Sequence, residues 1–424
     1  MKTLRVILVL TAISLASMLH AQKRVAVFIV GDYTGYGIPQ NEQWNDGNMG
    51  GGTEYGEFWN DTYLNWEYLC DEPNKPNLGY YNDFIFVLFA NGQDYQPPGY
   101  ANRYKLDLGE FLVDEEASSQ NVTTLLTGLV TGNGSIGGDA IPQLTDDDFL
   151  YIWTMGHGGT DVNGSYMHLK DDVMYDSEFA GMVNNITAQK KVITMQQGYG
   201  GGFADNFTGN NVIFYAACQS NQNGHRANNT PYLENELWNN VPYYHGEFNF
   251  HTYSPLAGES PGFDDEYNGT AYATVDADNN NVITINEMYA WENTHSNTSE
   301  TSLFADPGGI ASTTTLKYPN VISDNITSTT TMSGFIGVTK PVHIVSGATL
   351  TITNARLYLD YEGDIIVDNG ATLIIDDGVE ITGWCQGYQN KIIVNGNMDV
   401  GSEVIFLGEN DVIDDYRLKI TSVH

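Results

Sequence analysis

Two apolar segments of the chain each end in a glycine-rich turn of a kind that can hold catalytic groups. Residues 149–155 are followed by Gly156-His157-Gly158-Gly159, which places an imidazole at the end of an expected strand. Residues 192–194 lead into the segment 195–203, MQQGYGGGF, which has the form of a nucleophile loop but contains no nucleophile. Because open parallel sheets build their sites at the carboxyl ends of strands, we expect a proton-handling histidine beside a bare glycine turn.

These turns resemble the catalytic loops of the legumain-like family of caspase-type (clan CD) cysteine peptidases, in its secreted bacterial branch. In that family the first loop is similar to T-x-G-H-G-G and supplies the general base, and the second is similar to M-E-Q-C-Y-S-G-G-F. By this resemblance His157 occupies the position of the base, Gly198 replaces the catalytic cysteine, and Gly200 replaces a serine. The resemblance extends over roughly residues 24–305. It implies a caspase-like α/β/α sandwich with a parallel sheet.

Peptide hydrolysis by this chemistry needs a thiolate, an imidazole and amide donors aimed at the oxyanion. The resemblance implies that the N–H groups of Gly158 and Gly198 still form an oxyanion hole, but Gly198 carries no attacking atom. Cys218 corresponds to a wall of the pocket for the substrate side chain. Its thiol is interpreted either as a buried part of the pocket wall or as a replacement for the missing nucleophile.

The resemblance therefore favours a pseudoenzyme, a cysteine peptidase homologue that binds peptide or protein without cleaving it. One alternative is an active cysteine-type endopeptidase with His157 as base and an unaligned nucleophile. The other is a surface adhesion or structural protein that uses the first domain as a scaffold.

The spacing of apolar runs predicts the elements that position these turns. Buried-type strands are expected at 23–31, 84–92, 149–155, 192–194 and 211–218. Helices are expected from a cap at Ser119 through Leu129, and from Ser177 to Asn185. Alternation of strands and helices predicts a parallel α/β sheet. The segment 244–248 also resembles its family counterpart.

Residues 1–21 are predicted to be a secretory signal peptide, because a basic start is followed by a short apolar run and Ala21. A secreted or cell-surface protein is expected, with no transmembrane segment in the mature chain. The formal net charge of −36 makes nucleic acid an unlikely partner. No lysine follows the glycine turn at P-loop spacing, and three cysteines make no disulfide framework.

Residues 276–287 reproduce the spacing of an EF-hand-like calcium loop. The expected ligands are Asp276, Asp278, Asn280, the carbonyl of Val282, Thr284 and Glu287. Asn281 stands where glycine normally makes the sharp turn, although asparagine tolerates a left-handed backbone. The prediction is a weak, structural calcium site, and the alternative is an ordinary Asp/Asn turn before a helix at 287–293.

The sequence pattern changes near residue 306. This change predicts a peptidase-like domain at 22–305, a linker at 306–330 and a second domain at 331–424. The segment 344–352 recurs at 366–375 and, less regularly, at 393–400. A period near 25 residues favours a small β-solenoid, similar to a parallel β-helix, with a β-sandwich as the alternative. A spacer or adhesion module is the expected role.

Overall fold

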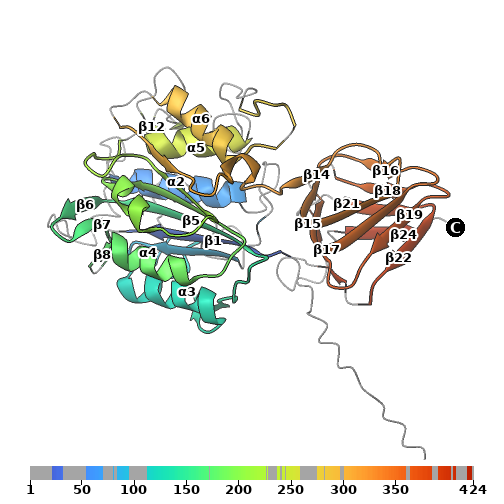
Figure 1. The fold of residues 1–424 in the computed structure, drawn as a ribbon, viewed down its shortest axis with the longest axis horizontal. Helices are drawn as coiled ribbons and strands as arrows, with labels where there is room; N and C mark the ends of the chain where they lie inside the picture. The colour runs from blue at the N-terminus through green and yellow to red at the C-terminus, as the bar shows by residue number, and fades with distance from the viewer. Residues whose placement is uncertain are drawn as a thin grey trace, which may run out of the picture.

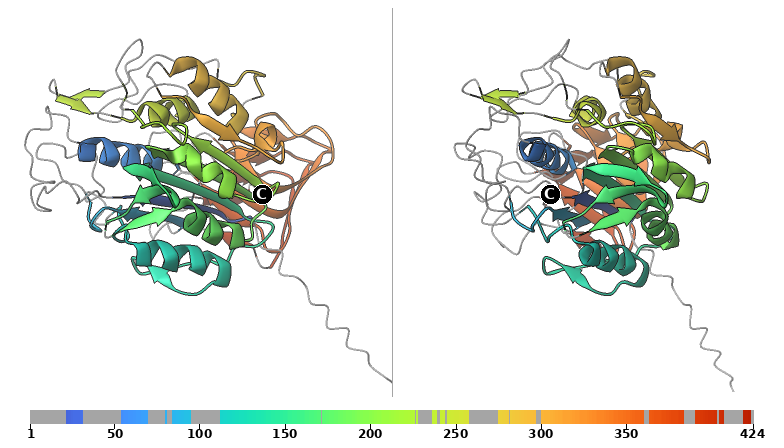
Figure 2. Two further views of the ribbon diagram at one scale, coloured as in Figure 1. Left: turned by 60° about the vertical axis from the view of Figure 1, so that its left-hand side comes forward. Right: turned by 90° about the vertical axis from the view of Figure 1, so that its left-hand side faces the viewer.

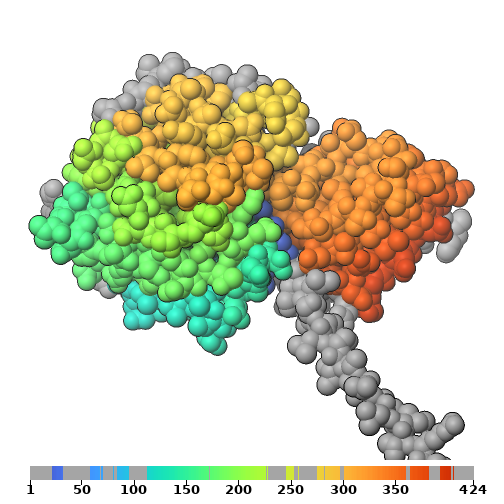
Figure 3. Space-filling view, viewed as in Figure 1, coloured from blue at the N-terminus to red at the C-terminus, as the bar shows by residue number. Residues whose placement is uncertain are grey.

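The computed structural model describes residues 22–31, 54–69, 80, 84–94, 112–170, 172–225, 227, 236–238, 241–243, 245–257, 275–280, 282–296, 300–359, 363–383, 390–402, 404–406 and 418–422. The expected signal peptide lies outside these residues, as do Cys70, Asn281 and Cys385. Figure 1 shows an α/β lobe followed by a β lobe, and Figure 3 shows that the two lobes touch along one side. Among the described residues, no helix is long and apolar enough to cross a membrane.

The α/β lobe is built on a six-stranded sheet with the order β13-β10-β9-β5-β1-β2. The strands are β1 (Arg24–Val30), β2 (Ile85–Phe89), β5 (Phe149–Gly156), β9 (Lys190–Gln197), β10 (Val212–Ala216) and β13 (Leu303–Ala305). All neighbouring pairs are parallel except β10 with β13. Strand β2 is apolar and buried throughout, as expected where helices cover both faces. The predicted mixed α/β fold with a parallel sheet is therefore confirmed.

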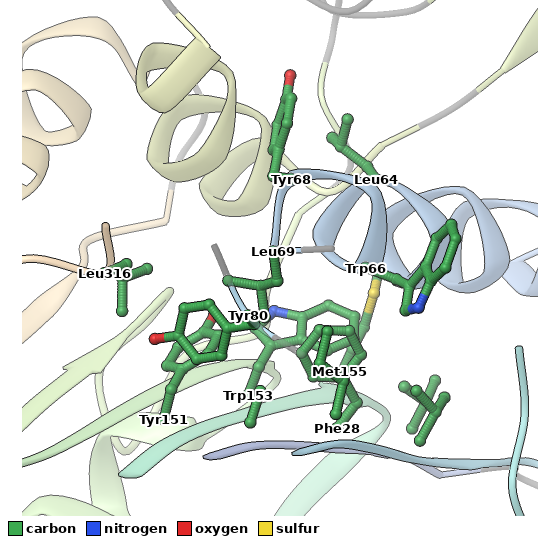
Figure 4. Packing of buried hydrophobic residues seen from close by; sticks show 14 of the residues in the cluster. Phe28, Leu64, Trp66, Tyr68, Leu69, Tyr80, Tyr151, Trp153, Met155 and Leu316 are labelled. Atoms are coloured by element: carbon green, nitrogen blue, oxygen red, sulfur yellow. The ribbon is translucent and has the colours of Figure 1, made fainter. Parts of the chain in front are cut away.

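Helices cover both faces of this sheet (Figures 1 and 2). One layer contains α2 (Glu54–Leu69), α5 (Glu247–Ala257) and α6 (Ile285–His295), and the other contains α3 (Ser119–Thr131) and α4 (Asp176–Asn185). Side chains of β1 alternate between the two cores: Phe28 packs in the core under α2, and Val27 in the core under α3 and α4. Figure 4 shows the first core, where aromatic side chains of the sheet meet those of α2.

The helix ends follow local signals, with one correction. Ser118, not Ser119, caps α3, and its Oγ accepts a hydrogen bond from the Asn121 N–H at 3.3 Å. Gly132 ends the helix with a left-handed φ of 69°. The other two expected helices form as α4 and α6, each slightly longer than expected. Helices α2 and α5 were not expected from the sequence.

Shorter elements complete the α/β lobe. They are β3 (Ser135–Ile136), β4 (Asp139–Ala140), β6 (Gly158–Asp161), β7 (Gly164–His168), β8 (Val173–Tyr175), β11 (Glu236–Trp238), β12 (Val241–Tyr243) and the 3-10 helices η5 (Gly200–Asn206) and η7 (Ala311–Thr313). Strands β6, β7 and β8 form an antiparallel sheet that starts directly after His157. This small sheet therefore flanks the candidate site.

The β lobe contains two sheets of parallel strands. One has the order β14-β15-β17-β19-β22, with β20 and β23 attached, and the other β16-β18-β21-β24. The strands are β14 (Asn320–Ile322), β15 (Thr330–Val338), β16 (Val342–Ile344), β17 (Thr349–Leu359), β18 (Ile365–Val367), β19 (Thr372–Ile375), β20 (Glu380–Gly383), β21 (Asn390–Val394), β22 (Asn397–Val400), β23 (Ile405–Phe406) and β24 (Leu418–Ser422). Thr349 pairs with Thr372, and Thr372 pairs with Asn397. The sequence repeat thus corresponds to successive parallel strands.

Arg24 connects the two lobes. Its guanidinium carbon lies 3.9 Å from the ring centroid of Phe149 and 5.2 Å from that of Phe335 in the β lobe. Its Nη2 donates to the carbonyls of Thr315 and Leu316. Since Arg24 and Phe149 are the first residues of β1 and β5, the β lobe packs at the sheet end opposite His157. The expected linker 306–330 contains η7 and β14.

Candidate functional site

The parallel register of β5 and β9 places the two glycine-rich turns next to each other. Gly156, the last residue of β5, pairs directly with Gln197, the last residue of β9. His157 directly follows β5, and Gly198 directly follows β9. Both residues therefore leave the sheet at the same edge. The meeting of the histidine turn with the bare glycine turn, which the sequence predicts, is therefore present in the structure.

The backbones of the two turns touch each other. A Cβ atom at Gly158 would overlap the carbonyl oxygen of Gly198, so only glycine fits at position 158. Gly198 differs, because a Cβ atom there would lie 3.4 Å from Asn223 Oδ1 and 3.5 Å from Asn223 Cα, which is ordinary contact. Its φ lies outside the left-handed region. Neither space nor backbone conformation therefore requires glycine at position 198.

His157 is half-buried at the edge of this contact. Its ring packs edge-on against Phe58 of α2, with the ring centroids 5.7 Å apart. Its carbonyl accepts a hydrogen bond from the N–H of His168 at 2.9 Å. Burial, followed by the nearby His157, lowers the pKa of His168. A second imidazole therefore stands close to the expected base and tends to stay neutral beside it.

Hydrogen bonds and close contacts fix the glycine turn after Gly198. Tyr199 has a left-handed φ of 63°, which is unusual for a residue with a side chain. Its N–H donates to the carbonyl of Gln222 at 2.7 Å, and the N–H of Gly201 donates to the carbonyl of Cys218 at 2.9 Å. A side chain at Gly202 would overlap Ser165 of β7. The turn is thus held between the end of β10 and the small antiparallel sheet.

Cys218 lies beneath the turn, not at its surface. Its side chain is fully buried, and its Sγ lies 3.3 Å from the carbonyl oxygen of Gln197 and 3.2 Å from that of Gln222. Burial is the main cause that raises the pKa of the thiol from 9.0 to about 11. A buried thiol with a raised pKa forms little thiolate at neutral pH, which makes it a poor nucleophile.

A buried polar network supports the end of β9 from the other layer. Asp61 of α2 accepts hydrogen bonds from the Gly246 N–H and the Asn249 Nδ2, both at 2.8 Å, and its Oδ1 lies 2.7 Å from His245 Nδ1. The Asn249 N–H donates to Gln196 Oε1 at 2.9 Å, only two residues before Gly198. The sequence gives no sign of Asp61 and Asn249, because they support the site only through contacts between distant segments.

Three carboxylates of the expected calcium loop converge. One oxygen each from Asp276, Asp278 and Glu287 lies within 4.8 Å of the others. The Asn280 N–H donates to Asp276 Oδ1 at 3.1 Å, which closes a tight turn. Glu287 also accepts hydrogen bonds from Thr284 and completes a capping box at the start of α6. The hard oxygen donors and their spacing suit a calcium ion.

The remaining expected ligands occupy this loop as well. The side-chain oxygen of Asn280 accepts a hydrogen bond from the Val282 N–H at 2.7 Å, which folds the loop back on itself. Asn279, at the fourth position of the loop, has a left-handed φ of 59°. The position normally held by glycine, Asn281, lies outside the described residues.

Comparison with known proteins gives no family for this chain. No family model matches the sequence. No curated protein matches it either.

Proposed function

We propose that the protein is a secreted pseudopeptidase that resembles the legumain-like cysteine peptidases and binds a peptide or protein segment without cleaving it. In this proposal the α/β lobe is a caspase-like domain, and the β lobe is a β-solenoid that serves as spacer or adhesion module. The leader at residues 1–21 would direct export.

One observation carries the proposal: the pairing of Gly156 with Gln197 brings His157 beside a position that has room for a Cβ atom but holds glycine. The turns leave the space that a Cβ atom at position 198 would fill. In the proposal the N–H groups of Gly158 and Gly198 would donate to one carbonyl oxygen of the bound segment. A peptide carbonyl could then be bound and polarised, but no atom would attack it.

In the same proposal the loop at residues 276–287 binds calcium and has a structural role. Asp276, Asp278 and Glu287 would hold a calcium ion, with Asn280, Val282 and Thr284 completing its oxygen shell. The ion would offset two of the three negative charges of the converging carboxylates and stiffen the start of α6. Calorimetry with calcium tests this part, because Asp276→Ala should abolish the heat of binding. Identical heats in both proteins would remove the site.

The proposal is tested with a mixed peptide library and calcium, using the mature chain, His157→Ala, Gly198→Cys, and Gly198→Cys combined with His157→Ala. We expect no cleavage by the wild-type chain, cleavage by Gly198→Cys, and loss of cleavage when His157 is also replaced. Cleavage by the wild-type chain that disappears in His157→Ala would instead identify an active endopeptidase. Absence of cleavage by a folded Gly198→Cys variant would favour the adhesion or structural interpretation.

A further inference from the structure

The α/β lobe contains a hollow outside the candidate site at His157 and Gly198. It has a volume of about 460 Å³ and lies between η5 and the edge pair β10–β13. The residues that line it are Ala204, Asp205, Phe207, Val212, Phe214, Ala305, Asp306 and Pro307. None of these residues belongs to the two glycine-rich turns, so the hollow is distinct from the site at His157 and Gly198.

The floor of the hollow is aromatic. The rings of Phe207 and Phe214 lie 5.3 Å apart between centroids and are inclined by 32°. Phe214 is almost wholly buried in the sheet, whereas Phe207 stays half-buried. Phe207 is held edge-on by Phe179 of α4, with centroids 6.1 Å apart. A fixed aromatic surface is thus available to a flat group from solvent.

Two carboxylates, those of Asp205 and Asp306, also line the hollow. Asp306 is held rigidly, because its two oxygens accept hydrogen bonds from the Ile310 N–H at 3.0 Å and the Ala311 N–H at 2.8 Å. Asp205 belongs to η5 and is exposed. Lys190 lies within electrostatic reach of Asp306, but its ammonium donates to the carbonyl of Thr313 at 2.7 Å. The hollow therefore combines aromatic rings with negative charge.

We propose that this hollow binds an arginine side chain presented by a peptide or protein partner. The guanidinium would stack on Phe207 and meet the carboxylates of Asp205 and Asp306. Arginine fits better than lysine, because its planar cation stacks on rings and pairs with carboxylates in a fixed geometry. The formal net charge of −36 also favours the approach of a cationic segment.

The test uses calorimetry on the full mature chain at low ionic strength. The probes are a heptapeptide with one central arginine among glycine and serine residues, and the same peptide with citrulline, which keeps the shape but removes the charge. We expect the arginine peptide to bind and the citrulline peptide to bind at least about fivefold more weakly. Asp205→Asn should weaken binding of the arginine peptide by about threefold to fivefold.

Two further variants separate this site from general attraction. Phe207→Leu keeps an apolar floor but removes the ring, and should weaken binding by about threefold. Asp146→Asn removes one exposed charge that does not line the hollow and should leave the affinity unchanged. The proposal fails if the arginine peptide does not bind, if citrulline binds equally well, or if Asp205→Asn has no more effect than Asp146→Asn.

Discussion

The neighbouring strands β9 and β10 end side by side, and their ends differ in one respect that matters for chemistry. After β9, Gly198 has room for a side chain and stands beside His157, but it carries no reactive atom. After β10, Cys218 carries a thiol, but the thiol is buried and its pKa is raised to about 11. A catalytic nucleophile must combine the right position with a reactive group in one residue. Here the position belongs to Gly198 and the thiol to Cys218.

Thiol reactivity should show the largest difference between the two strand ends. The shift in the pKa of Cys218 from 9.0 to about 11 lowers its thiolate fraction at neutral pH by about a hundredfold. Native wild-type protein and Gly198→Cys are treated with iodoacetamide, and each cysteine is followed by peptide mass spectrometry. The introduced thiol should react at least about a hundredfold faster than Cys218. Similar rates would mean that Cys218 is accessible and that the two positions do not differ in thiol reactivity.

The buried hydrogen-bond network beneath the end of β9 can be disrupted by replacing Asp61. Asp61→Asn replaces an acceptor of several buried hydrogen bonds with a group that must also donate, so the free energy of unfolding should fall by about 3 kcal/mol. Urea denaturation measures this change, and the exposed Asp146→Asn serves as the control. A loss below about 0.5 kcal/mol would show that the network does not hold the turn.

Two glycines of the turn after β9 can also be compared, one that contacts the end of β10 and one that does not. A Cβ atom at Gly201 would lie 2.6 Å from the carbonyl oxygen of Cys218, so Gly201→Ala should lower the free energy of unfolding by about 2 kcal/mol. Gly198→Ala is the matched control, since its Cβ atom fits, and should change the same quantity by no more than about 0.5 kcal/mol. Equal losses in both variants would contradict the open space at position 198.

The pH dependence of stability should report on Cys218. Its folded pKa is raised, so the contribution of the buried neutral thiol is complete below about pH 9 and is lost as the pH rises towards about 11. Relative to Cys218→Ala, the wild-type protein should lose about 2 kcal/mol in its free energy of unfolding across this range. A constant difference between the two proteins from pH 8 to 11 would show that the thiol is not held neutral.

The parallel sheet and the adjacency of the two turns could be predicted because both depend on local, periodic signals. A buried apolar run that ends at glycine marks a strand and its carboxyl end. The chain between 149 and 198 supplies two such runs with a helix between them. The register, in which Gly156 faces Gln197, comes from the structure and not from these sequence signals.

The support of the site could not be predicted, because it depends on contacts between distant segments. Asp61 and Asn249 are nearly two hundred residues apart and meet only in the folded helix layer. The role of Arg24 is similar, since nothing near it in the sequence indicates that its partner, Phe335, lies in the other lobe. Single-sequence patterns carry no information about such pairs.

The most direct test of the central claim is the pKa of the thiol introduced by Gly198→Cys, measured from the pH dependence of its alkylation. The same measurement is made after His157 is also replaced by alanine. If His157 and position 198 still form a nucleophile–base pair, the thiol pKa should lie below the ordinary value of about 8.5 and rise in the double variant. The same pKa in both proteins would contradict the account.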